Sequence, residues 1–155
     1  MEENDLTDRV KKEEVFRNEV QQLVSNEPNE RPQVLVGRTY KIKTNCGNCY
    51  ITVNHIGGED TPDFRIVEVF ATLGKSGGCA TALLQGLTRT VSLSLRSGIP
   101  EDKVVKMLKG VGCPSPFYGN PILGKGIAKS CIDAVARVLD LEVVTNKKEV
   151  SSGTK

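Results

Sequence analysis

The run RTYKIKTNCGNCYITVN, residues 38–54, alternates apolar and polar side chains on either side of a short polar break. Alternation with a period of two predicts β-strands that bury one face. Gly47 and Asn48 supply a turn, so the run predicts a tight hairpin. Further on, FRIVEVFATL, residues 64–73, is rich in β-branched and aromatic residues and predicts a third strand. The three strands together predict an antiparallel meander.

Beyond this meander the apolar residues recur at helical intervals. One helical face collects Leu84, Leu87, Val91 and Leu95, and Gly98 ends the helix. A short helix opens at Pro100 and runs to about residue 109, and a last helix is predicted over residues 127–141. The predicted class is therefore α+β, with a small three-stranded antiparallel sheet packed against a long helix plus two shorter helices.

The length of 155 residues is typical of one domain, and the sequence at each end indicates a segment outside that domain. Apolar residues recur at helical intervals among charges over residues 5–25, and the linker NEPNERP follows, so we expect an N-terminal amphipathic helix. The apolar face of this helix should be buried, so we expect it to pack against the rest of the domain or against another copy of the chain in a homo-oligomer. The expected organisation is a helical extension and linker over 1–30, a domain over 31–142 and a disordered tail over 143–155.

Composition narrows the class of protein further. The hydrophobic content is 38% and the net charge is +2, as in soluble globular domains. No run reaches the roughly 20 apolar residues that cross a bilayer, and no apolar signal core is present, so we expect a cytoplasmic protein without a membrane partner. No dense basic block with interleaved aromatic residues is present, and nucleic acid is therefore not an expected partner.

Five cysteines in a cytosolic chain leave metal-ligand, redox and core roles open. Four of them lie at predicted element boundaries, where the backbone can bend to present a side chain, namely Cys46, Cys79, Cys113 and Cys131. The fifth, Cys49, forms a CxxC with Cys46. This pair is a redox couple, half of a metal site, or a functional Cys46 beside a Cys49 that is an ordinary strand residue, facing outward or toward the core. We favour the last, because redox pairs usually begin helices.

Other candidates are weaker. The run GKSGGC, residues 74–79, is either an anion nest with Lys75 or a glycine-rich turn that points Cys79 inward. His55 is expected on the surface. Arg89 and Arg96 share a helical face, which is more typical of a solvated face than of a substrate clamp. We expect Asp133 to orient the cysteine site. No set of acid–base or nucleophilic residues emerges, so no catalytic residue is predicted.

Four runs in order carry a resemblance to a known family: RPQVLVGRTYKIKTNCGNCYITVN, EVFATLGKSGGCATALLQGLTRTVSLSLRSGI, VVKMLKGVGCPSP and SCIDAVARVL. Together they closely resemble the TSCPD domain, which ends the adenosylcobalamin-dependent, class II ribonucleotide reductases and also occurs as small free-standing proteins. The resemblance covers residues 31–139. One departure is that Ile132 stands in KSCID where the family has the proline of TSCPD.

The resemblance implies a metal site at Cys46, Cys79, Cys113 and Cys131. Zinc is the expected ion, with an iron–sulfur cluster as the alternative. It also implies an accessory module of ribonucleotide reduction, and hence of deoxyribonucleotide biosynthesis and DNA replication, acting with a reductase catalytic subunit. The chain is too short for a complete ribonucleoside-diphosphate reductase. Two other hypotheses are a metal-stabilised scaffold that self-assembles or docks a partner through the N-terminal helix, and a thiol–disulfide carrier using Cys46 and Cys49.

Overall fold

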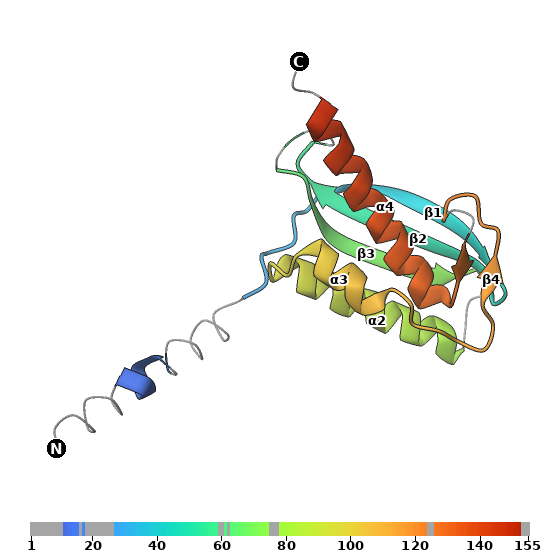
Figure 1. Cartoon of the computed structure of the whole chain (residues 1–155), viewed down its shortest axis with the longest axis horizontal. Coiled ribbons are helices and arrows are strands. Elements are labelled where there is room, and N and C mark those ends of the chain that lie inside the picture. The colour runs from blue at the N-terminus through green and yellow to red at the C-terminus, as the bar shows by residue number, and fades with distance from the viewer. Residues whose placement is uncertain are drawn as a thin grey trace.

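The computed structural model describes residues 11–15, 17, 27–58, 61, 63–74, 78–123 and 126–152, the last seven by backbone alone. In chain order the elements are β1 Val36–Thr44, β2 Gly47–Ile56, β3 Arg65–Leu73, α2 Cys79–Arg96, α3 Glu101–Leu108, β4 Phe117–Tyr118, β5 Ile127–Ala128 and α4 Cys131–Ser152 (Figure 1). The predicted α+β class is confirmed. Residues 11–15 and 17 are helical, and the remainder of the predicted N-terminal helix lies outside the described residues.

The predicted meander is confirmed as a three-stranded antiparallel sheet in the order β1-β2-β3. Thr44 pairs with Gly47, so the two residues of the hairpin turn are Asn45 and Cys46 rather than Gly47 and Asn48. Gly47 has a φ of +117°, a conformation that a side chain would strain. The turn therefore places Cys46 at the tip of the hairpin.

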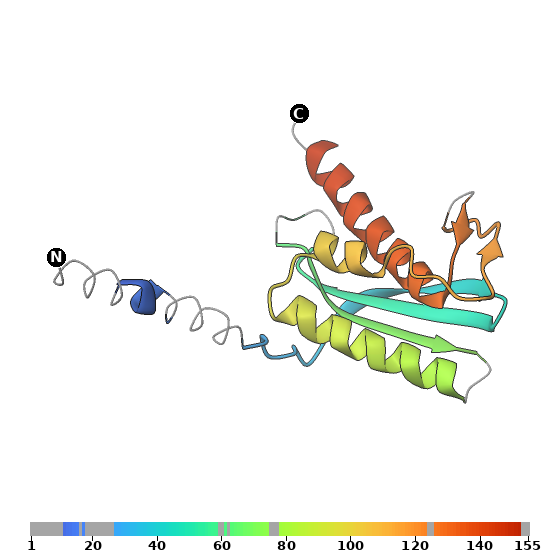
Figure 2. The same ribbon diagram turned by 60° about the horizontal axis from the view of Figure 1, so that its bottom comes forward.

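The two faces of the sheet differ. One face is the core, where strand side chains pack against α4, and α3 packs beside α4 over the same face (Figures 1 and 2). Its strand residues are Ile42, Cys49, Ile51, Val53, Val69, Ala71 and Leu73. The other face carries Lys41, Lys43, Tyr50, Thr52 and Phe70, none of them buried. Alternation along each strand produces this division.

Helix α2 lies along the outer edge of β3, as both views show (Figures 1 and 2). The buried hydroxyl of Ser92 accepts the N–H of Val69 at 2.9 Å, and its oxygen lies 3.0 Å from the Val69 carbonyl oxygen. A serine on the helix thus takes the place that a neighbouring strand would take. The long helix that we expected to pack on the sheet does so through this edge.

The last helix differs from its predicted bounds at both ends. Residues 127 and 128 form β5, which pairs with β4 as a small second sheet that the sequence did not predict. Helix α4 starts at Cys131 because Ser130 caps it, accepting the N–H of Asp133 at 3.1 Å. It continues to Ser152, into the segment expected to be disordered.

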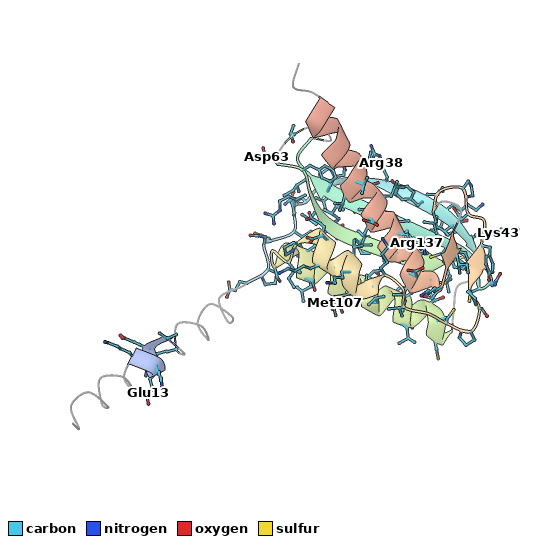
Figure 3. All side chains as sticks on the ribbon, in the orientation of Figure 1. Glu13, Arg38, Lys43, Asp63, Met107 and Arg137 are labelled. Atoms are coloured by element: carbon cyan, nitrogen blue, oxygen red, sulfur yellow. The ribbon has the colours of Figure 1, made fainter. Side chains whose placement is uncertain are left out.

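Contacts with β1 hold α4 at residue 142, just past its predicted end. Glu142 is buried, accepts a short hydrogen bond from the Tyr40 hydroxyl, and lies 3.3 Å from Arg38 Nη1. Figure 3 shows Arg38 beside α4 and Lys43 at the turn end of β1. Among the described residues, no helix is long and apolar enough to cross a membrane.

Candidate cysteine site

The four cysteines predicted as ligands lie at element boundaries, as expected. Cys46 is in the β1–β2 turn, Cys79 is the first residue of α2, Cys113 is in the loop after α3, and Cys131 is the first residue of α4. The turn and the starts of α2 and α4 lie at the same end of the molecule (Figures 1 and 2). The fold therefore brings separate parts of the chain to one end of the sheet.

Cys46 and Cys113 both lie close enough to Cys131 to affect the ionisation of its thiol. Burial raises the pKa of Cys131, and the thiols of Cys46 and Cys113 raise it further, while a contact with Thr44 opposes them. Cys79 is exposed and takes part in none of these interactions, so the alternative in which the glycine-rich turn points it inward is not what the structure has. Within the described ranges, no three Cys, His, Asp or Glu residues stand close enough to hold a metal ion. The four-cysteine site stays a prediction.

Thr44 links the hairpin tip to the start of α4. Its buried hydroxyl donates to the Gly47 carbonyl at 2.7 Å and accepts the N–H of Cys46 at 3.2 Å. The Cys131 thiol faces the same oxygen at 3.8 Å. One threonine thereby fixes the turn that carries Cys46 and contacts the cysteine that opens α4.

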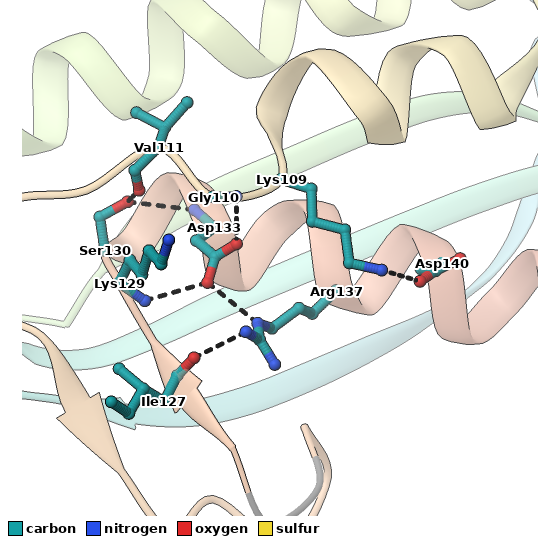
Figure 4. Close-up of polar contacts among 9 residues, drawn as sticks. All are labelled: Lys109, Gly110, Val111, Ile127, Lys129, Ser130, Asp133, Arg137 and Asp140. Carbon is teal, nitrogen blue, oxygen red and sulfur yellow. Dashed lines mark hydrogen bonds and ion pairs between the residues drawn. The ribbon is translucent and has the colours of Figure 1, made fainter.

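Asp133 organises the loops on the other side of the site (Figure 4). Its fully buried carboxylate accepts the N–H of Gly110 at 2.7 Å, the N–H of Lys129 at 2.9 Å and Arg137 Nε at 2.9 Å. Burial alone would raise the pKa of Asp133, but the two backbone hydrogen bonds and the Arg137 guanidinium together hold it below its usual value. The carboxylate is thus held ionised and joins the α3–α4 loop to the start of α4.

Further backbone contacts position Cys113 within that loop. Its N–H donates to the Lys129 carbonyl at 3.0 Å, and the Ser130 hydroxyl donates to the Val111 carbonyl at 2.6 Å. On the opposite side, Asn45 of the hairpin donates its side-chain amide to the Pro116 carbonyl at 2.8 Å. The loop is therefore hydrogen-bonded to the elements that carry Cys46 and Cys131. The expectation that Asp133 orients this region agrees with its contacts.

Cys49 faces the core. It is 0% exposed, pairs across the hairpin with Ile42, and belongs to the main hydrophobic cluster. Burial, with smaller contributions from Cys131 and Cys46, raises the pKa of this thiol to about 12. At neutral pH it carries its proton and has little nucleophilic character. The preferred interpretation of the CxxC, Cys49 as an ordinary strand residue beside Cys46, agrees with this placement.

The donor set suits a thiophilic cation. Burial raises the pKa of Cys131, and Cys46 and Cys113, which lie on two other parts of the chain, raise it further. A bound cation reverses that balance, since coordination favours deprotonated sulfur. Zinc and iron–sulfur clusters both take such ligands. The thiol chemistry of these residues therefore suits either group, whereas their spacing within the described ranges is not that of a formed metal site.

His55 is buried, so the prediction that it lies on the surface is wrong. It is 5% exposed rather than on the surface, and its ring lies 4.6 Å from the Phe64 ring, measured between centroids. The alternation that places Cys49 in the core also places His55 there, so this signal was available in the sequence. Thr44 was missed as well, because its role depends on contacts between distant segments.

These features define a class, a small α+β domain with cysteines gathered at one end of its sheet. The family model for the TSCPD domain matches residues 19–143, so the chain belongs to the TSCPD domain family. Comparison with curated proteins finds no match, and neither does comparison with solved structures.

Proposed function

We propose that this TSCPD domain is an accessory module of ribonucleotide reduction in which Cys46, Cys79, Cys113 and Cys131 bind one structural zinc ion. Family membership supports the link to reductases. The observation that supports the metal site is that Thr44 contacts two of these cysteines. Its hydroxyl oxygen lies 3.2 Å from the Cys46 backbone nitrogen and 3.8 Å from the Cys131 thiol, and Cys113 is hydrogen-bonded to Lys129 beside the start of α4. The expected location is the cytoplasm.

The expected role of the ion is to stabilise the fold. Four thiolates complete a tetrahedral shell and leave no open position for water or substrate. Bound there, the ion would tie the hairpin and the loop after α3 to both cysteine-bearing helices. The protein supplies the positioning: Thr44 orients the hairpin tip, and Asp133 holds the loop that carries Cys113.

The metal content of the purified full-length chain tests the first half of the proposal. We expect one zinc per chain by plasma mass spectrometry, and loss of the metal in single serine variants of Cys46, Cys79, Cys113 or Cys131. Cys49→Ser is the matched control and should retain the metal. Absorption in the visible range would instead identify an iron–sulfur cluster. Metal-free protein with four intact cysteines, or equal loss in Cys49→Ser, would contradict the site.

Binding to a class II reductase catalytic subunit tests the second half. We expect co-purification of that subunit with the wild-type chain and weaker recovery with Cys113→Ser. A stable homo-oligomer that ignores the reductase would favour the scaffold hypothesis instead. The thiol–disulfide carrier receives no support from Cys49, whose buried thiol has a pKa of about 12.

A further inference from the structure

A groove opens between α2 and the sheet face that α4 leaves uncovered. Its floor comes from β2 and β3, and its wall comes from α2. Its volume is about 220 Å³, below the roughly 300–1,000 Å³ of pockets that enclose whole drug-sized ligands. The space therefore suits one flat ring system, with the remainder of a ligand outside. It lies on the opposite side of the sheet from the α4-covered core.

Two aromatic side chains line this groove. Thr52 pairs with Phe70 and Tyr50 pairs with Thr72, which makes Tyr50 and Phe70 diagonal neighbours, at about 7–8 Å between backbones. Phe70 is 45% exposed, so its ring is accessible from solvent on this face of the sheet. Exposed aromatic rings on an antiparallel sheet are platforms on which nucleobases stack.

Polar groups from α2 complete the lining. Gln85 presents an amide, with donors and an acceptor that match the edge of a base. Arg89, four residues further along α2, adds a guanidinium, and no ion pair of Arg89 occurs among the described residues. A guanidinium is a strong partner for phosphate.

The surrounding charge favours an anion. Lys41 pairs with Tyr50 and Lys43 pairs with Asn48, so both lysines lie on the same face as the groove. Among the described strand residues, Glu68 is the acid on this face, and it is neutralised by Arg31, with Nε at 2.7 Å from its carboxylate. An approaching phosphate therefore meets net positive charge.

We propose that this groove binds a free nucleotide, whose base stacks on Phe70 beside Tyr50 and whose phosphate pairs with Arg89. An aromatic ring alone would also suit an apolar ligand, but the adjacent guanidinium and amide select a ring that carries an anion and hydrogen-bonding edges. The enclosed space for a single ring favours a free nucleotide over a strand of nucleic acid. The site does not depend on the proposed metal.

Isothermal titration calorimetry with the full chain tests the proposal, using adenosine monophosphate (AMP) as the probe. We expect saturable binding that weakens as salt rises. Phe70→Ala should weaken AMP binding roughly 5- to 150-fold, the affinity equivalent of losing one base–aromatic stack. Arg89→Gln should weaken binding and flatten its salt dependence. Gln85→Ala, at an exposed position, gives a third variant that leaves the core untouched.

Matched controls come from outside the groove. Tyr118→Ala removes an aromatic ring that is 71% exposed on β4, and Arg65→Gln removes an exposed guanidinium at the start of β3. Both should bind AMP as the wild type does. Absence of AMP binding, equal binding of inorganic phosphate, or equal weakening in the controls would overturn the site. A preference for a short single-stranded oligoadenylate over AMP would overturn the assignment to a free nucleotide.

Discussion

At the scale of single residues, neighbouring cysteines have different chemistry. Cys46 is exposed at the hairpin tip, whereas Cys49, three positions later, is buried in the core. Alternation along β2 accounts for the burial of Cys49, and the turn accounts for the exposure of Cys46. Reactivity of each thiol should therefore follow position in the hairpin rather than membership of the CxxC.

Alkylation of the metal-free protein tests this difference. With iodoacetamide at about neutral pH, we expect modification of Cys46, Cys79 and Cys113, and protection of Cys49 until the chain unfolds. Peptide mass spectrometry would locate the modified thiols, and protein in urea is the control in which all five react. Rapid modification of Cys49 in the native protein would mean that this core position opens readily.

Stability at alkaline pH gives a second test of Cys49. Its pKa is about 12 in the folded protein and about 8.5 in an unfolded chain, so the unfolded state loses this proton first. Between these values, ionisation favours unfolding, at about 1.4 kcal/mol per pH unit for this thiol. We expect Cys49→Ala to show a smaller fall in unfolding free energy between about pH 9 and 10.5. A fall equal to that of the wild type would contradict the burial.

At the scale of elements, Asp133 connects α4 to the loop that precedes it. Its folded pKa lies below the unfolded value of about 3.9, so its contribution to stability is present above that value. The contribution is lost as pH falls through the folded pKa. Asp133→Asn should lower stability at neutral pH and flatten the loss of stability below about pH 4, measured by urea unfolding. Asp140→Asn, an exposed acid of the same helix paired with Lys109, is the matched control.

The helices and strands also show which parts of the fold could be predicted from the sequence. Alternation and helical periodicity predicted β1, β2, β3 and α2, because each buries one face and the pattern is local. The start of α4 was misplaced although the capping serine, Ser130, is a local signal that the sequence contains. The β4–β5 pair was missed because it joins two segments of the α3–α4 loop whose pairing no local pattern indicates. For the same reason the approach of Cys46 and Cys113 to Cys131 was implied only by family resemblance. Local spacing carries no information about how the α3–α4 loop folds back.

At the scale of the whole molecule, the proposed metal would tie the loop after α3 to the remainder of the domain. Cys113→Ser should lower the thermal midpoint and expose residues 110–126 to protease, whereas Cys49→Ser should cause a much smaller change. Structural zinc contributes an apparent ~10–16 kcal/mol in small zinc peptides, which makes a large effect reasonable. Scanning calorimetry with limited proteolysis measures both. Equal losses in the two variants would mean that the CxxC acts as a pair.

The N-terminal extension belongs to this scale as well. Asn29 donates its N–H to the Arg96 carbonyl at 3.0 Å, and Arg31 pairs with Glu68, so the linker is attached to the domain. Removing residues 1–26 preserves both contacts and deletes the predicted amphipathic helix. We expect a lower mass by light scattering, because that helix is predicted to contact another chain. An unchanged mass and unchanged solubility would argue against such contact.

The serine that closes the edge of β3 also determines where the sheet can grow. A strand from another molecule needs free backbone N–H and carbonyl groups, and at Val69 these are already engaged by Ser92. The described sheet can therefore be extended only at β1, its other edge. That strand carries Arg38, Lys41 and Lys43. Charged side chains on an edge strand oppose the edge-to-edge pairing that leads to aggregation. Helix α2, anchored by the buried Ser92 hydroxyl, thus closes the β3 edge and leaves β1 as the open edge of the described three-stranded sheet.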